Sequence, residues 1–212
     1  MPVPILVLPL LAIAAAACPR PPPVKALVMA GAEPVSVQTD FGLAQMRTLA
    51  KQANRVELHP PYGFYIGGVA YAISVTIGNE AHDVCVGPIN IRMTMKLVTR
   101  HIEVAQELKD DPCKFRRVVA HYQHHAEADA AVFERYVVLV MEALSHTPAA
   151  SFVANLAAGS VRKQIAQATQ SVIEPVLASM DADRASARAV VDTPAEVSGL
   201  EKACTRQPRN EL

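Results

Sequence analysis

Two histidines in the middle of the chain have the spacing of a metal-binding pair. His121 and His125 lie four residues apart in a segment with helical periodicity. On a helix, residues i and i+4 lie about 6 Å apart on one face, so two imidazoles at this spacing can bind one zinc ion. Hydrolysis would also need a base beside the metal-bound water. The residue after His121 is Tyr122, whose reference pKa of about 10 excludes that role at neutral pH.

A metal ion needs at least one ligand beyond this pair. His101 and Glu103 lie on a predicted strand just before the helix, and we expect them to be the additional ligands if that strand runs beside the helix. Glu103 is also a weak candidate for a catalytic base. Asp129 continues the row of the two histidines but is two turns from His121, too far to share its metal. The other histidines considered are His59, His82 and His124, of which His124 is expected to point further out.

A long helix positions the histidine pair. Asp111 is a favoured N-cap residue and Pro112 suits the first helical position. From there to Thr147-Pro148, apolar residues recur every three or four positions, which makes a continuous stripe. At ~100° per residue the histidines fall at the border of this stripe, as expected of a cleft beside a sheet edge.

The strand before the helix has two parts. Apolar and polar residues alternate from Ile89 to Leu97, which predicts a strand with one buried face. The alternation then changes phase, so that Ile102 is apolar while His101 and Glu103 share the opposite face. A bulge or turn near residues 98–99 accounts for the change.

Weaker patterns complete the layout. They predict strands over residues 24–29 and 71–77, a helix over 42–52, a second long helix over 150–180 that is kinked at Pro175 and continues over 183–191, and a last short helix over 194–204. The expected fold is α+β, with a small antiparallel or mixed sheet packed against two long C-terminal helices. We expect one domain, 25–212, that is sheet-rich over 25–108 and helical over 111–204.

The N-terminal residues have the pattern of an export signal. Residues 1–17 are uncharged and end in four alanines before Cys18, which predicts a cleaved signal peptide. The basic n-region is missing, because the first basic residue is Arg20, so a wrong start codon or a short uncleaved anchor also fits. Residues 18–24 form a Pro-rich spacer. We expect an exported protein, periplasmic or secreted, and a lipoprotein if Cys18 is acylated.

The distribution of charge bears on which kinds of partner the protein can bind. The net charge is zero and neither sign forms a long block, which argues against a nucleic-acid binder. Apart from the N-terminus, no apolar run reaches the ~18 residues that cross a bilayer. The expected partner is an unknown protein or envelope component. Membrane contact is expected only if Cys18 is lipidated or the N-terminal segment stays uncleaved.

The cysteines favour disulfides over metal binding. Cys18, Cys85, Cys113 and Cys204 are an even number, and no CxxC spacing occurs. Of the three sets of pairs, we favour Cys85–Cys113, which would fasten the sheet to the helix. Cys18–Cys204 would then join the chain ends. Lipidation of Cys18 would instead leave Cys204 unpaired.

A resemblance to a known group rests on three motifs. These are Arg100-His101-Ile102-Glu103, Asp111-Pro112-Cys113, and His121 with His125. Over residues 85–145, and more faintly from Asp192 to Cys204, the chain resembles exported bacterial proteins of the zincin-like HExxH type, many of whose relatives have lost the glutamate. The resemblance implies a zincin-like core and a metal pair at the two histidines. Tyr122 departs from it at the catalytic position.

These patterns predict a non-catalytic binding or structural protein, a pseudoenzyme whose His121 and His125 bind a divalent metal. Zinc is the expected ion, although two imidazoles also suit copper and nickel. One alternative is an active zinc-dependent hydrolase with Glu103 as a non-standard base. Another is a helical interaction protein without a metal site, since HxxxH without its glutamate is a weak pattern.

Overall fold

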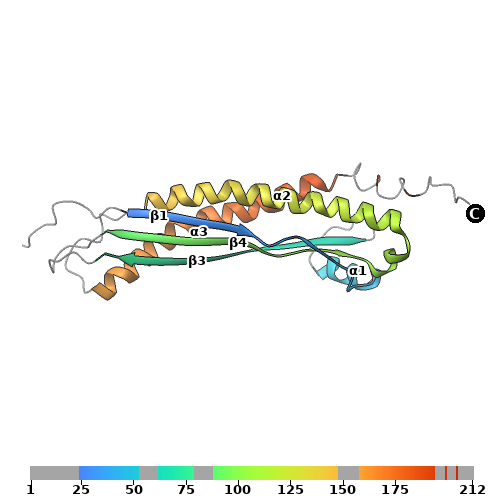
Figure 1. The fold of residues 1–212 in the computed structure, drawn as a ribbon, viewed down its shortest axis with the longest axis horizontal. Helices are drawn as coiled ribbons and strands as arrows, with labels where there is room; N and C mark the ends of the chain where they lie inside the picture. The colour runs from blue at the N-terminus through green and yellow to red at the C-terminus, as the bar shows by residue number, and fades with distance from the viewer. Residues whose placement is uncertain are drawn as a thin grey trace, which may run out of the picture.

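A narrow sheet and two long helices make up the α+β fold of the chain in a computed structural model (Figure 1). The structure describes residues 24–52, 62–78, 88–147 and 158–193, together with Gly199 and Cys204. Its elements are β1 (Val24–Ala32), β2 (Ser36–Gln38), α1 (Leu43–Gln52), β3 (Gly63–Ile77), β4 (Ile89–Val104), the short 3-10 helix η1 (Gln106–Asp110), α2 (Pro112–Ser145) and α3 (Ala158–Val191). The predicted fold class is confirmed.

β4 is the central strand of a mixed sheet. β1 and then β2 pair with it in parallel along one edge, and β3 pairs with it antiparallel along the other. Before its change of phase β4 buries every second residue, as the alternation predicts. β3 begins at Gly63, earlier than the sequence indicates, because its glycine-rich first half pairs with the last residues of β4.

A bulge in β4 lets apolar residues from both halves of the strand face the core. The register with β3 shifts between Ile66 and Gly68, and Thr99 has a positive φ of 55°. The extra residue turns Ile102 toward the same side of the sheet as the apolar residues before the bulge, so that it packs with residues of α2. The predicted bulge is confirmed, and β4 continues through it.

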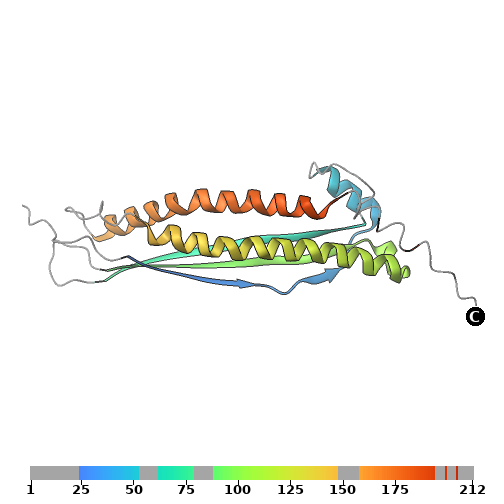
Figure 2. The ribbon, with the colours of Figure 1, turned by 90° about the horizontal axis from the view of Figure 1, so that it is seen from above.

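The two long helices lie antiparallel on one face of the sheet (Figure 2). α2 begins at the predicted cap, where the Asp111 side chain accepts a hydrogen bond from the Lys114 N–H at 3.1 Å. The main core lies between the strands and the C-terminal half of α2 with α3. Its fully buried members include Met93, Met95, Val140 and Ile165.

Several predictions fall on residues outside the described ranges. They concern the signal peptide, the spacer up to residue 23, Cys18, His59, His82, Cys85, residues 150–157 of the second long helix and most of the last short helix over 194–204. Within the described residues, none of the helices combines the length and the apolar character that a membrane span requires.

Candidate metal centre

Three side chains from two distant parts of the chain meet at one point. His121 and His125 lie on successive turns of α2, and Asp192 follows the last residue of α3. Both histidines are buried, with 4% of their surface exposed, whereas the Asp192 side chain is 49% exposed. In the described part of the chain, no other histidine, cysteine or carboxylate joins this group. We call His121, His125 and Asp192 the His-His-Asp group.

The ligand atoms have the separations that one small cation requires. The two Nε2 atoms are 3.2 Å apart, and Asp192 Oδ1 lies 3.2 Å from His121 Nε2 and 2.9 Å from His125 Nε2. In a tetrahedral zinc site with bonds of 2.0 to 2.1 Å, neighbouring ligand atoms lie about 3.3 Å apart. The three atoms therefore form one face of such a tetrahedron, with the fourth position left over.

Hydrogen bonds alone do not satisfy this triangle. Each Nε2 atom carries either one proton or one lone pair in the plane of its ring. A proton on one nitrogen can point at only one of the other two atoms, so at least one close contact always lacks a hydrogen bond. A single cation that accepts all three lone pairs removes this conflict.

The charge of the group also suits a cation. Burial opposes ionisation of Asp192, but hydrogen bonds from His121 and His125, and their positive charge when protonated, outweigh it, so the pKa of this carboxyl group lies well below its ordinary value. Asp192 is therefore a carboxylate at neutral pH. His121 Nδ1 is buried and has no hydrogen-bond partner among the described residues. A ligating histidine usually donates this N–H to an acceptor. The free energy of metal binding here therefore has to exceed the cost of leaving this buried N–H unpaired among the described residues.

Tyr122 supports the histidine pair from the side of the sheet. Its ring stacks on His125, with ring centroids 5.3 Å apart, and meets His121 edge-on at 4.8 Å. A Cβ atom at Gly63 of β3 would come within 2.8 Å of this ring, so the absence of a side chain there lets β3 approach α2. Tyr122 is therefore a packed aromatic residue that borders the two histidines.

The chain has no match among models of protein families, curated proteins or solved structures. The group's geometry therefore carries the functional argument.

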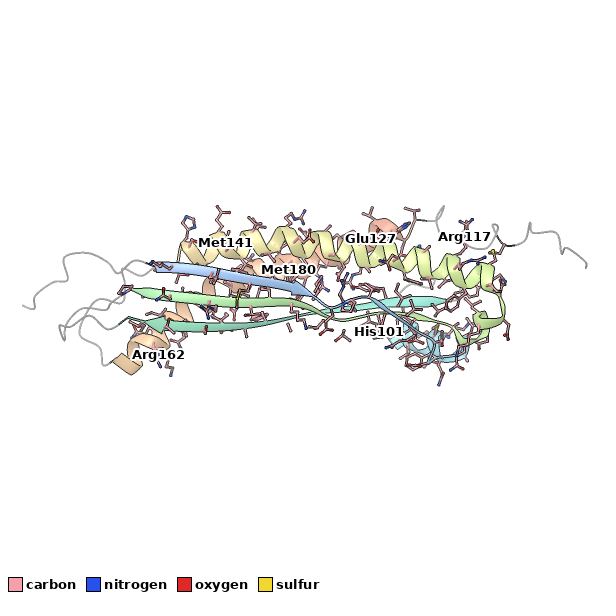
Figure 3. All side chains as sticks on the ribbon, viewed as in Figure 1. His101, Arg117, Glu127, Met141, Arg162 and Met180 are labelled. Carbon is pink, nitrogen blue, oxygen red and sulfur yellow. A yellow bond between two sulfur atoms is a disulfide. The ribbon has the colours of Figure 1, made fainter. Side chains whose placement is uncertain are left out.

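His101 and Glu103 do not join the His-His-Asp group, contrary to the expectation that they would supply its further ligands. Ile102, between them, faces α2, so both point to the opposite side of β4. There the fully buried Glu103 accepts hydrogen bonds from the backbone N–H groups of Asp40 and Phe41. Figure 3 shows His101 among the strands, away from α2. A base on this face cannot serve a metal beside α2.

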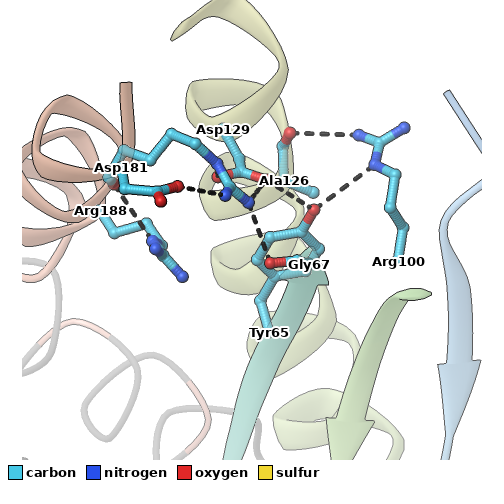
Figure 4. Close-up of polar contacts among 8 residues, drawn as sticks. Tyr65, Gly67, Arg100, Ala126, Asp129, Asp181 and Arg188 are labelled. Carbon is cyan, nitrogen blue, oxygen red and sulfur yellow. Dashed lines mark hydrogen bonds and ion pairs between the residues drawn. The ribbon is translucent and has the colours of Figure 1, made fainter. Parts of the chain in front are cut away.

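Asp129, one turn beyond His125, belongs to a buried ion pair instead of the metal group. Its two oxygens lie 2.8 and 3.0 Å from the Arg184 guanidinium of α3, in a two-point contact. Asp129 also accepts a hydrogen bond from the Tyr65 hydroxyl at 3.2 Å, and Arg184 donates to the Gly67 carbonyl at 2.9 Å (Figure 4). This network fastens α3 to α2 and to β3.

A disulfide joins Cys113, in the first turn of α2, to Cys204, with a Cα–Cα distance of 5.8 Å. The favoured pairing of Cys113 with Cys85, and the accompanying pairing of Cys18 with Cys204, are therefore wrong. α3 runs back along α2, toward the start of that helix. That return, which strand and helix patterns do not reveal, brings Cys204 to Cys113.

Asp192 is the ligand that sequence reasoning missed as an individual residue. It lies 67 residues from His125, and only the antiparallel return of α3 brings them together. Its position directly after the last helical turn, before Thr193-Pro194, was the available signal. A carboxylate at a helix end is common, so this signal alone does not indicate a ligand.

Proposed function

We propose that this protein binds a divalent transition metal, with zinc the expected ion, through His121, His125 and Asp192, and acts as a binding or structural module. The observation that carries the proposal is the triangle of three ligand atoms, with edges of 2.9 to 3.2 Å. Two imidazoles and one carboxylate suit zinc, and copper and nickel are the competing ions.

Peptide hydrolysis is not part of the proposal. Three protein ligands leave a position at which zinc could bind water, as catalytic zinc sites do. The chemistry that zinc supplies there would still need a base. Tyr122 packs against the histidines, and Glu103 lies on the other face of β4. The hydrolase alternative therefore lacks its candidate base.

We extend the proposal to an exported, zincin-like protein. The Cys113–Cys204 disulfide supports an oxidising compartment. A histidine-bearing helix packed along a mixed sheet agrees with the layout that the resemblance implies.

Metal content of the purified protein, prepared without an affinity tag of histidines, tests the proposal. We expect about one zinc per chain in the wild type and none in His121→Ala/His125→Ala. Asp192→Asn keeps the size of the side chain but removes its charge, and should weaken zinc binding at least ~100-fold, since loss of a supporting residue alone costs 10- to 100-fold. His124→Ala is the matched control, because His124 lies beside His125 but outside the group.

The outcomes separate the three functions. Zinc that is lost only in the ligand variants supports the proposal. If the wild type contains no metal and the double histidine variant folds as the wild type does, an interaction protein without a metal site would be favoured instead. Peptidase activity that a chelator abolishes and zinc restores would establish the hydrolase and refute the non-catalytic assignment.

A further inference from the structure

We propose that the Cys113–Cys204 disulfide controls the affinity of the metal site, so that reduction of this bond weakens metal binding. The inference rests on the proposed function, because it concerns the regulation of the same site. It makes the protein a metal binder whose affinity follows the redox state of its surroundings.

Three described residues of the C-terminal part of the chain are attached to one row of α2. The row contains Cys113, His121, His125 and Asp129, which lie at multiples of four residues along the helix. Their partners are, in the same order, Cys204, Asp192 for both histidines, and Arg184. The metal site is therefore the middle attachment, between a disulfide and a buried ion pair.

Asp192 lies beyond the most deeply buried part of α3. After Arg184, no residue of α3 is buried, and Val190 is 73% exposed. Asp192 itself is 49% exposed. The position of its carboxylate therefore depends on the attachment two turns earlier, at Arg184, and on the one that follows, at Cys204.

A segment that is held at both ends keeps its middle close to the partner. The closed disulfide restricts the conformations open to Asp192 and so raises its effective concentration at the histidine pair. When the disulfide opens, the attachment at Cys204 is lost while the one at Arg184 remains, and metal binding then has to order the carboxylate to a greater extent. Because the histidines and Arg184 persist, we expect weaker binding and not complete loss.

The sulfur atoms act through position and not as ligands. Cys113 precedes His121 by two helical turns, about 12 Å along the axis at ~1.5 Å per residue, so its thiolate cannot reach a metal between the histidines. Reduction by a dithiol breaks the sulfur–sulfur bond and places two electrons and two protons on Cys113 and Cys204. The dithiol supplies them and closes its own disulfide.

Zinc affinity, measured by competition with a chromophoric chelator, tests whether the disulfide controls metal binding. The oxidised wild type is compared with Cys113→Ser/Cys204→Ser and with the matched control Lys114→Ala, which removes the exposed ion pair to Asp111 on the same turn of α2. We expect a dissociation constant at least ~5-fold higher in the double variant and within ~2-fold in the control. Equal zinc affinity in the wild type and the double variant would overturn the proposal that the disulfide controls metal binding. No zinc binding by the oxidised wild type would refute the proposed function itself.

A second measurement needs no cysteine variant, in case the double variant does not fold. Coupling is reciprocal, so zinc should shift the thiol–disulfide equilibrium of the wild type toward the disulfide by the same factor of at least ~5. Redox buffers of reduced and oxidised dithiothreitol, with free zinc set by a chelator, followed by thiol alkylation and mass spectrometry, measure this shift. His121→Ala/His125→Ala should show none. A zinc-independent equilibrium in the wild type would overturn the inference.

Discussion

The two halves of α2 bury different kinds of side chain. Its C-terminal half buries Phe133, Val140 and Leu144 against the sheet and α3, where apolar shape is sufficient. The part of α2 from its start to its midpoint at Asp129, called the polar half below, buries the polar side chains of His121, His125 and Asp129. A buried polar group is costly unless it is paired, so this half needs a specific partner for each group. The C-terminal part of the chain provides most of those partners. The burial of the polar half therefore depends on contacts between residues that are distant in sequence.

The largest effect should come from breaking the buried ion pair of the polar half. Asp129→Ala leaves the buried Arg184 guanidinium with only the exposed Asp181, at 3.3 Å, as an ionic partner among the described residues, which should cost about 3 to 5 kcal/mol of unfolding free energy. Chemical denaturation measures this loss. The double variant Asp129→Leu/Arg184→Met should recover most of it, because replacing both partners by apolar groups is often neutral. A double variant as unstable as Asp129→Ala would contradict the explanation.

The apolar half should lose stability without losing the site. Leu144→Ala creates a cavity in the main core and should cost about 3 kcal/mol. Zinc affinity, measured below the unfolding transition, should stay at the wild-type value, because Leu144 lies at the opposite end of α2 from the histidines. A large fall in affinity would mean that the two halves are energetically coupled.

Zinc should stabilise the folded chain only while the ligands of the polar half are intact. A ligand at 100 times its dissociation constant adds about 2.7 kcal/mol of stability. We expect this increment, seen as a higher midpoint of thermal unfolding, in the wild type and in Leu144→Ala. His125→Ala should show no increment, and neither should the wild type with an excess of chelator. An increment in His125→Ala would place the metal elsewhere.

The smallest effect is expected at Glu103. In Glu103→Gln the side-chain oxygen can still accept from the N–H groups of Asp40 and Phe41, so the change in stability should stay below ~1 kcal/mol. Zinc affinity should not change. Isothermal titration of this variant beside the wild type is a direct check, and altered affinity would mean that β4 reaches the metal after all.

The contrast between the halves also explains what the sequence could predict. The alternation of β4, its bulge, the Asp111-Pro112 start of α2 and the histidine pair follow from local rules, and the structure has each of them. The identity of the third ligand and the partner of Cys113 depend on where α3 returns the chain. Because no local pattern encodes that return, the sequence points to His101 and Glu103 as further ligands and not to Asp192.

The long separations of the polar partners have a consequence for the order of assembly. His121 and Asp192 are 71 residues apart, and Cys113 and Cys204 are 91 apart. Synthesis proceeds from the N-terminus, so the strands and α2 exist well before their last partners are made. The metal site and the disulfide are thus completed only after Asp192 and Cys204 have been made. A bound ion would then report that α3 has been made and has docked on α2.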